Sequence, residues 1–307
     1  MKLPRRTFVR LAASAVAAPA LSHFAWAATD RPVRILVGFA PGSAPDIVAR
    51  LIAQSLSERT SQEFIVDNRT GTGGNVATEA VVNAAPDGHT LLLVGPSSAI
   101  DVTLYDRLGF DFRRDIAPVA AVVSSPHVMA VGPCLAVKTA SEFVAHAKAN
   151  PGKLTMASAG IGTASHLAGE LFQMQTGTML EHVVYRGGDG AYAALLGGSV
   201  DVYFPPLISA TDHIKRGALR ALPGTAAPGC EANTWFGIGA PSNTPAHIVD
   251  RLNREINAAL AESALAARLD DVGGTVIAGS AADFGALIAG ETTKWSKLIK
   301  ASTTSLG

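Results

Sequence analysis

The chain alternates short apolar runs with stretches in which apolar residues recur every three or four positions. Runs such as Val33–Phe39, Thr90–Val94 and Leu154–Ala157 are mostly apolar, as expected of buried strands. The spacing of apolar residues in Ile47–Leu56 predicts an amphipathic helix. Strands that alternate with helices in this order indicate an α/β fold. Further strands are expected at Phe64–Val66, Ala117–Val131, His182–Tyr185 and Val200–Phe204, and helices at Val76–Asn83, Ser141–Lys148, Leu167–Gln175, Ala191–Leu196, Ile248–Leu260 and Ser280–Ile299.

Three of the predicted strands run into glycine-containing loops that precede a predicted helix. These loops are Ala40–Asp46, Gly160–His166 and Tyr185–Gly190. Glycine permits the backbone angles of tight turns, and the first turn of a helix presents unpaired N–H groups and the positive end of its dipole. In open α/β sheets, ligands bind at this edge. One such loop is most simply a tight turn, whereas three together indicate a site for a carboxylate or phosphate. Ser43 and Asp46 also predict a capping box.

The first 27 residues have the pattern of an export signal. Basic residues without an acid precede the apolar run Leu11–Leu21, which is too short to span a bilayer, and Ala25–Ala27 has the form of a cleavage site. The pair Arg5-Arg6 resembles a twin-arginine signal, from which Pro4 departs, and an ordinary secretory signal is the alternative. Either route predicts a periplasmic protein from which the signal has been removed.

Composition narrows the classes of function. The chain has 25 Lys and Arg against 25 Asp and Glu, and this lack of basic excess argues against nucleic-acid binding. The predicted signal holds four of the basic residues and no acidic one, which leaves 21 basic against 25 acidic residues in the mature chain. The attraction for an anion must therefore come from local amides and helix ends rather than from global charge.

Six strings along the chain form a recognisable set, at residues 39–58, 66–81, 85–94, 157–172, 183–204 and 235–260. Taken in this order, they resemble the Bug-type periplasmic receptors of the tripartite tricarboxylate transporter family. The resemblance implies a two-lobed periplasmic-binding-protein fold (type II-like, Venus flytrap) with two crossing hinge strands. It implies a receptor, not an enzyme, that captures a small carboxylate between its lobes and delivers it transiently to membrane permease subunits. Lobe one would hold residues 28–118 and 239–307, and lobe two residues 119–238.

The same resemblance assigns the ligand contacts. Main-chain amides and hydroxyl groups of the three glycine loops would hold the carboxylate, and Ser97 and Ser98 would line the pocket from lobe one. Arg186, the one full positive charge in these loops, could clamp a second carboxylate or simply face solvent. The expected contacts are Ala40, Gly42, Ser43, Asp46, Ser97, Ser98, Gly160, Gly162, Thr163, Ser165, His166, Tyr185, Arg186 and Gly187.

The chain departs from the family pattern at positions that affect ligand choice. Gly190 stands where the family usually has proline, and Pro205-Pro206 stands where it tends to have polar residues. The segment Ala221–Cys230 is shorter than the corresponding family loop, and the first glycine loop contains less glycine. These differences leave the fold prediction unchanged and the identity of the ligand open.

Other chemistry has little support in the sequence. Ser165 and His166 are adjacent at a predicted helix start, where their side chains diverge and cannot easily form a nucleophile–base pair. No histidine spacing suits a metal ion and no complete dinucleotide motif occurs, so we expect no metal, no cofactor and no catalysis. A co-receptor for a signalling system and an exported enzyme on the same fold are the alternatives. We expect the protein to be a monomer.

The two cysteines form the last candidate feature. On the family template, the crossing strands contain His127–Val131 and Trp235–Ile238, which places Cys134 and Cys230 near the same end of the pair. In an oxidising compartment the two could form a disulfide, and two separate thiols are the alternative.

Overall fold

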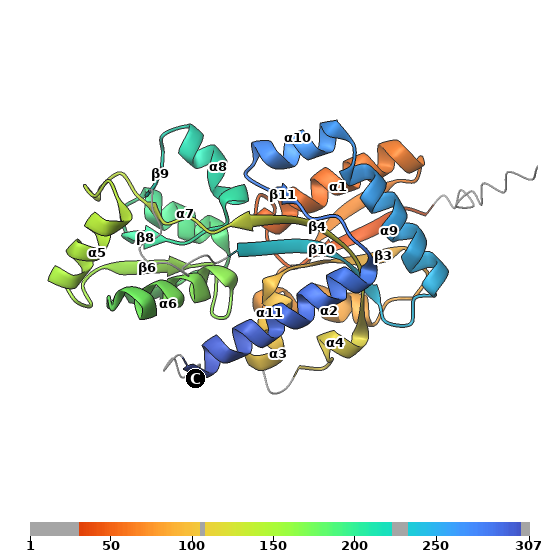
Figure 1. Ribbon diagram of the computed structural model, residues 1–307, viewed down its shortest axis with the longest axis horizontal. Coiled ribbons are helices and arrows are strands. Elements are labelled where there is room, and N and C mark those ends of the chain that lie inside the picture. Colours follow the sequence, from red (N-terminus) through yellow and green to blue (C-terminus); the bar gives the residue numbers. More distant parts are fainter. Residues whose placement is uncertain (1–30, 105–107, 223–232, 302–307) are drawn as a thin grey trace, which may run out of the picture. The chain divides into compact units, whose positions relative to one another are not determined.

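Two β-sheets, each covered by helices, organise the residues that the structure describes (Figure 1). The structure is a computed structural model that describes residues 31–104, 108–222 and 233–301. The prediction of an α/β fold is confirmed, and we call each sheet with its helices a lobe. No helix in the described part of the chain combines the length and the hydropathy that crossing a membrane requires.

The first lobe contains a mixed sheet in the order β11-β4-β10-β3-β1-β2. Strands β1, β2 and β3 are parallel, as expected of strands connected through helices. Strand β10 is antiparallel to both of its neighbours, β3 and β4. The strands are β1 (Val33–Val37), β2 (Phe64–Asn68), β3 (Thr90–Val94), β4 (Ile116–Pro126), β10 (Asn233–Pro241) and β11 (Thr275–Val276). The helices are α1 (Ala44–Thr60), α2 (Asn75–Val82), α3 (Pro96–Leu104), α4 (Phe112–Asp115), α9 (Ala246–Leu260), α10 (Ser263–Asp271) and α11 (Ala281–Ala301), with the 3-10 turn η1 (Thr72–Gly74) before α2.

The second lobe contains a smaller sheet in the order β7-β6-β8-β5-β9. Here β6 is parallel to both of its neighbours, and β5 is antiparallel to β8 and β9. The strands are β5 (Ala130–Val131), β6 (Thr155–Ser158), β7 (Glu181–Val184), β8 (Val202–Tyr203) and β9 (Arg220–Ala221), and the helices are α5 (Ala140–Ala149), α6 (Ala164–Thr176), α7 (Gly188–Leu196) and α8 (Leu207–Lys215).

The long strands β4 and β10 pair antiparallel and lead from one lobe to the other (Figure 1). Trp235 on β10 lies opposite Ser124 on β4, so the expectation that His127–Val131 forms the crossing strand is wrong. Pro126 ends β4, and residues 130–131 of the predicted run belong to β5 in the second sheet. The expected lobe boundaries after residues 118 and 238 fall inside these two strands and stay a prediction.

Close packing along the crossing strands depends on a glycine. A Cβ atom on Gly237 would lie 2.6 Å from the Ala120 carbonyl oxygen and 2.3 Å from the Phe284 ring. Such distances are far below contact distance, so a side chain at this position would push β10 away from β4 and α11.

One apolar cluster joins the two lobes beside the crossing strands. Ile100 of α3, Leu167 of α6 and Trp295 of α11 pack together and are each at most 2% exposed. The indole Nε1–H of Trp295 donates to Glu291, 2.9 Å away, so its polar group is also satisfied. The cluster fixes the first turn of α6 next to α3, and both helix starts line the site described below.

Candidate functional site

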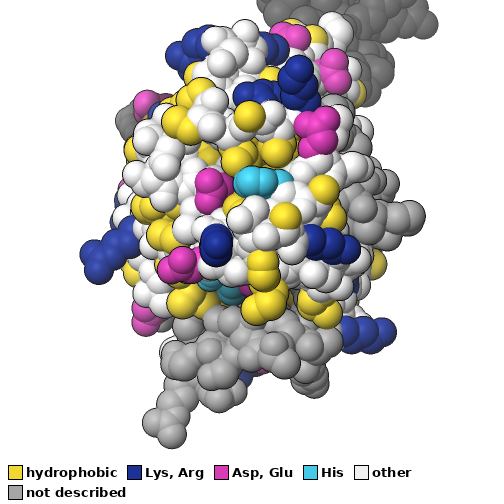
Figure 2. Space-filling view, turned by 90° about the vertical axis from the view of Figure 1, so that its left-hand side faces the viewer, with side chains coloured by type: hydrophobic (Ala, Val, Ile, Leu, Met, Phe, Trp, Pro, Cys, Tyr) yellow, Lys and Arg dark blue, Asp and Glu magenta, His cyan; other side chains and the backbone are white. Residues whose placement is uncertain are grey.

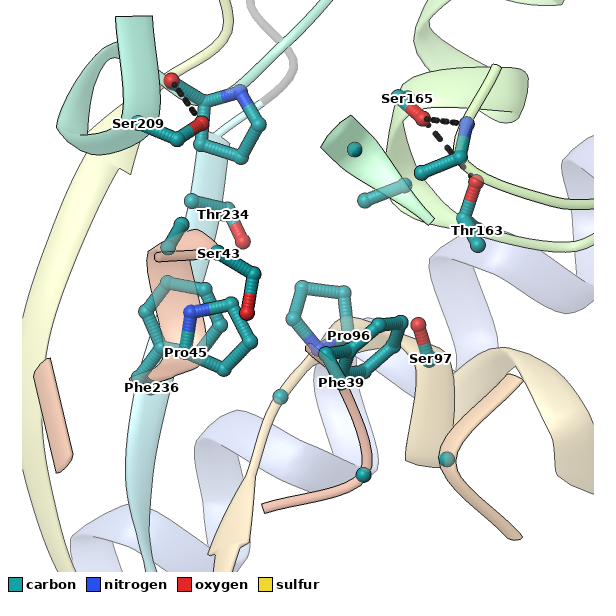
Figure 3. Close-up of a pocket in the computed structure, with 18 of the residues that line it drawn as sticks. Phe39, Ser43, Pro45, Pro96, Ser97, Thr163, Ser165, Ser209, Thr234 and Phe236 are labelled. Atoms are coloured by element: carbon teal, nitrogen blue, oxygen red, sulfur yellow. Dashed lines mark hydrogen bonds between the residues drawn. The ribbon is translucent and has the colours of Figure 1, made fainter. Parts of the chain in front are cut away.

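A cleft lies between the two lobes, where loops from both sheets meet (Figure 3). Its empty volume is about 970 Å³, which includes the solvent-open mouth. The crossing strand β10 contributes Thr234 and Phe236 to its wall. The first lobe contributes Gly38, Phe39, Gly42–Pro45, Gly73, Gly74, Thr78, Leu92, Leu93 and Gly95–Ser98, and the second contributes His127, Ala159, Thr163–Ser165, Gly188, Asp189, Tyr192, Tyr203, Pro206, Ser209 and His213.

The first glycine loop is held in shape by a buried carboxylate. Asp46 is 1% exposed and accepts hydrogen bonds from the Gly42 N–H (2.8 Å), Arg50 Nε (2.9 Å) and Asn68 Nδ2 (2.9 Å). Burial by itself would raise the pKa of Asp46, but the hydrogen bonds from Arg50, Gly42 and Asn68 hold it below its usual value. Asp46 therefore fixes the loop from behind, while Gly42 and Ser43 line the cleft.

The predicted capping box between Ser43 and Asp46 is wrong, because the hydrogen bonds that define it do not form. Ser43 is the N-cap residue, but its hydroxyl donates to the Ala40 carbonyl (2.6 Å) and caps no helical N–H. Asp46 reaches past Ser43 to the Gly42 N–H. Gly42 has φ +84°, a left-handed conformation that favours glycine, and this turn redirects the chain so that the two side chains do not meet.

The second glycine loop places two hydroxyl groups and a helix start in the cleft. Thr163 is the N-cap residue of α6; its Oγ1 donates to the Gly160 carbonyl (2.7 Å) and lies 3.0 Å from Ser165 Oγ. Ser165 Oγ also accepts the Ala159 N–H at 3.1 Å. These bonds fix the hydroxyl positions shown in Figure 3, and Ala164 and Ser165 begin α6 at the cleft wall.

Behind this loop lies a stacked pair of histidines. The rings of His166 and His182 are 4.2 Å apart and nearly parallel, and His166 Nδ1 accepts the Gly162 N–H at 3.2 Å. Burial, and then the charge of His182, lowers the pKa of His166 to about 4, and burial also lowers the pKa of His182. Both imidazoles are thus neutral near neutral pH, and His166 supports the Gly160–His166 loop from the side away from the cleft.

A serine–histidine hydrogen bond occurs here, but it does not make a usable nucleophile. His182 Nε2 lies 2.7 Å from Ser158 Oγ, a distance typical of an activated serine. However, Ser158 is fully buried (0% exposed) and is not among the cleft residues. A substrate in the cleft cannot reach it, so this pair stabilises the loop.

The third glycine loop brings an acid, Asp189, into the cleft, and of the two positions considered for Arg186 the structure shows the solvent-exposed one. Gly187 has φ +108° and donates its N–H to the Ala159 carbonyl (3.0 Å), which ties this loop to the preceding one. Gly188 and Asp189 then line the cleft at the start of α7. Arg186 is exposed and lies outside the set of cleft residues.

The expected contacts thus divide into two groups, and ligand contact itself stays a prediction for both. The structure brings together in the cleft Gly42, Ser43, Ser97, Ser98, Thr163 and Ser165. Those that support or flank the loops outside the cleft lining are Ala40, Asp46, Gly160, Gly162, His166, Tyr185, Arg186 and Gly187.

Sequence reasoning missed an aromatic wall on the second lobe. The Tyr192 hydroxyl lies 2.9 Å from Ser209 Oγ, and its ring packs edge-on against Tyr203 at 5.3 Å and stacks on His213 at 4.7 Å. Ser209 and His213 belong to α8, a helix that the sequence pattern did not predict. The sequence signal for this wall was the presence of tyrosines within predicted elements: Tyr192 lies in the predicted helix Ala191–Leu196.

The electrostatics of the cleft depend on the main chain. Among the cleft residues within the described ranges, Asp189 is the one formally charged side chain and no Lys or Arg occurs. The N-termini of α1, α3, α6 and α7 all border the cleft. The first turn of α6 contains no acidic residue, so its dipole and its free N–H groups are not offset. This arrangement suits an anion with an apolar body.

The predictions about a metal ion and a disulfide concern His, Cys, Asp and Glu side chains. In the described ranges, no three His, Cys, Asp or Glu side chains gather in a way that could hold a metal ion. Cys134 is exposed. Cys230 and most of the short Ala221–Cys230 segment lie outside the described residues, so the disulfide stays a prediction.

Comparison with known proteins identifies a family. The model for the tripartite tricarboxylate transporter family receptor matches residues 48–228 and 223–304. A protein in the tcbD-tcbE intergenic region of Pseudomonas sp. (strain P51) is 35% identical over 288 residues, which cover 88% of this chain and 86% of that protein. Protein BugT of Bordetella pertussis is 32% identical over 289 residues, covering 88% and 89% of the two chains.

Solved structures agree with the sequence comparison. The R. palustris protein Rpa4515 with adipate superposes with a TM-score of 0.85 at 30% identity, covering 88% of this chain and 96% of that one. MatC from Rhodopseudomonas palustris with bound malate gives 0.81 at 28% identity, covering 88% and 99%. The predicted two-lobed periplasmic-binding-protein fold is confirmed.

Proposed function

Because the chain belongs to the tripartite tricarboxylate transporter receptor family, we propose that it captures a small carboxylate in the periplasm and delivers it to a membrane permease. The observation that carries this proposal is the start of α6, an acid-free helix N-terminus that faces the cleft beside the Thr163 and Ser165 hydroxyl groups. Relatives crystallised with adipate and with malate support a carboxylate as the ligand class.

The carboxylate would be held at the first turn of α6. Ala164 and Ser165 are the first two helical residues, and their N–H groups have no partner within the helix. The hydroxyl groups of Thr163 and Ser165 lie next to them, already oriented by Gly160 and Ala159. The Thr163 hydroxyl already donates to the Gly160 carbonyl, so the two amides and the Ser165 hydroxyl are the donors that this turn can offer to a carboxylate, and the helix dipole adds favourable charge.

Closure of the lobes would strengthen this binding. The crossing strands β4 and β10 connect the lobes, and bending along them would bring the second-lobe wall of the cleft toward Ser43 of the first lobe. Water would leave the cleft, and each amide–carboxylate bond would act in a lower dielectric. A closed, loaded form differs in surface from the open one, which allows a permease to recognise it.

The proposal is tested by removing one N–H group. In Ala164→Pro the helix start is retained, because proline is favoured at the first helical position and Thr163 already has the extended conformation that precedes proline (φ −71°, ψ 157°). We expect ligand affinity to fall by about tenfold to a hundredfold, as for one charge-assisted hydrogen bond of about 1.5–3 kcal/mol.

The matched control is Ala140→Pro at the start of α5. Ala140 also follows an extended N-cap threonine, Thr139, and lies outside the cleft lining. Calorimetric titration with aliphatic, aromatic and dicarboxylic acids is the assay, and thermal unfolding checks that both variants fold. The proposal fails if no carboxylate in the panel binds the wild-type protein, or if both variants bind equally well.

A further inference from the structure

The cleft contains an acidic side chain where an anion receptor would be expected to have none. Asp189 lies in the first turn of α7, is exposed, and lines the cleft. It takes part in none of the ion pairs found among the described residues. No Lys or Arg lies among the described residues that form the cleft, so no cationic side chain there offsets its charge.

Two buried aromatic residues, Tyr192 and Tyr203, line the cleft with Asp189. A Cβ atom on Gly188, the residue before Asp189, would lie 3.7 Å from the Tyr203 hydroxyl oxygen. Burial raises the pKa of Tyr192 and of Tyr203 well above the usual value, and the negative charge of Asp189 contributes in the same direction to both. The Asp189 carboxylate is thus close enough to interact electrostatically with both tyrosine hydroxyl groups of the aromatic wall.

We propose that Asp189 selects ligands by charge, so that the cleft accepts a carboxylate with a neutral or positively charged far end and disfavours a second carboxylate. This inference rests on the proposed function and names the substrate class of that site. The first carboxylate of the ligand takes the α6 start, and the remainder of the ligand extends toward Tyr192 and Asp189.

The physical reason is like-charge repulsion in a cleft that closes. A second carboxylate near Asp189 would lose water on closure and would meet one negative charge and no positive side chain. An ammonium group at the same place would be attracted to Asp189 and to the faces of Tyr192 and Tyr203. A plain alkyl or aryl end would pack on the same rings without penalty.

Three ligands with the same number of carbon atoms test this selection: hexanoate, 6-aminohexanoate and adipate, whose far ends are neutral, positively charged and negatively charged, respectively. Calorimetric titration of the wild-type protein should show adipate about tenfold or more weaker than 6-aminohexanoate, with hexanoate between them. We call the ratio of the weakest to the tightest Kd among the three ligands the spread. In Asp189→Asn the spread should shrink to about threefold or less. In the wild-type protein, high salt should also narrow the spread, because part of the interaction is screened.

The matched control is Asp250→Asn. Asp250 is an exposed acid on α9, outside the cleft, so its removal changes net charge equally and should leave the spread unchanged. The inference is overturned if adipate binds the wild-type protein as well as 6-aminohexanoate does, or if the spread survives in Asp189→Asn. If other carboxylates bind while this pattern is missing, the inference fails and the proposed receptor function stands. If no carboxylate binds at all, both fail.

Discussion

Replacement of Asp46 by asparagine tests whether this acid supports the site from behind. Its two oxygens accept three hydrogen bonds, two on Oδ2 from Gly42 and Arg50 and one on Oδ1 from Asn68. In Asp46→Asn, whichever way the amide turns, its NH₂ group faces at least one of these donors. The negative charge that pairs with Arg50 is also lost.

The expected size of the effect follows from burial. The Asp46 side chain is 2% exposed, and hydrogen bonds to a buried charged group are worth about 1.5–3 kcal/mol each. With one bond lost and the others weakened, we expect Asp46→Asn to lower the free energy of unfolding by about 2–4 kcal/mol. For a chain of this size, that corresponds to a fall in Tm of about 3–7 °C.

The assay is thermal and urea unfolding of Asp46→Asn beside Asp212→Asn. Asp212 also pairs with an arginine four residues later on a helix, but the distance is 3.9 Å and its side chain is 77% exposed, so no change is expected. Because the pKa of Asp46 is lowered on folding, its contribution is present above the unfolded value of 3.8 and is lost as the pH falls through the folded value. Equal stability of the two variants at neutral pH would refute the reasoning.

Three further predictions concern groups away from the ligand. Burial raises the pKa of Asp101 from 3.8 to about 8, so the folded chain keeps a proton that the unfolded chain releases; stability should fall as the pH rises from about 4 to about 8, and Asp101→Asn should remove this fall in urea unfolding. Burial lowers the pKa of His166 to about 4, so stability should decrease as the pH drops from about 6.5 to 4, and His166→Gln should flatten this decrease; an unchanged slope would contradict the assignment. In Gly132→Ala the new Cβ would lie 2.3 Å from the Leu195 carbonyl oxygen and should cost about 1–3 kcal/mol, whereas Gly290→Ala, with nothing within 4 Å, should cost nothing in the same melts.

The glycine loops could be predicted from sequence because their signal is local. A buried apolar run, a glycine and a helix start follow one another within a few residues, and Gly42, Gly160 and Gly187 do have positive φ angles. The predicted helix start at Ser280 is local in the same way: Ser280 and Asp283 form reciprocal hydrogen bonds of 2.9 and 3.1 Å at the start of α11.

Helices α3 and α8 could not be predicted because tertiary packing determines them. The sequence Pro96–Leu104 has no clear helical spacing of apolar residues, yet Ile100 is fully buried against Leu167 and Trp295 from other helices. Helix α8 follows Pro205-Pro206, which stands where the family tends to have polar residues and so predicted fewer polar groups at this edge of the cleft. Instead, that helix supplies Ser209 and His213 to the aromatic wall.

The roles of Asp46 and Asp189 also depended on the fold. Both acids stand in the first turn of a helix, where sequence alone gives them the same stabilising role with the dipole. The neighbouring strand supplies Asn68 to Asp46 and makes it structural. Asp189 has the cleft beside it instead, which turns a helix-start acid into a candidate determinant of ligand charge.

The most direct test of the central claim is native mass spectrometry of the mature protein mixed with competing anions. The mixture contains aliphatic and aromatic carboxylates together with the sulfonates, phosphonates and alcohols of the same carbon skeletons. The account predicts a one-to-one complex with a carboxylate, weakened in Ala164→Pro. A complex dominated by a sulfonate, phosphonate or alcohol, or no complex with any member of the mixture, would contradict it.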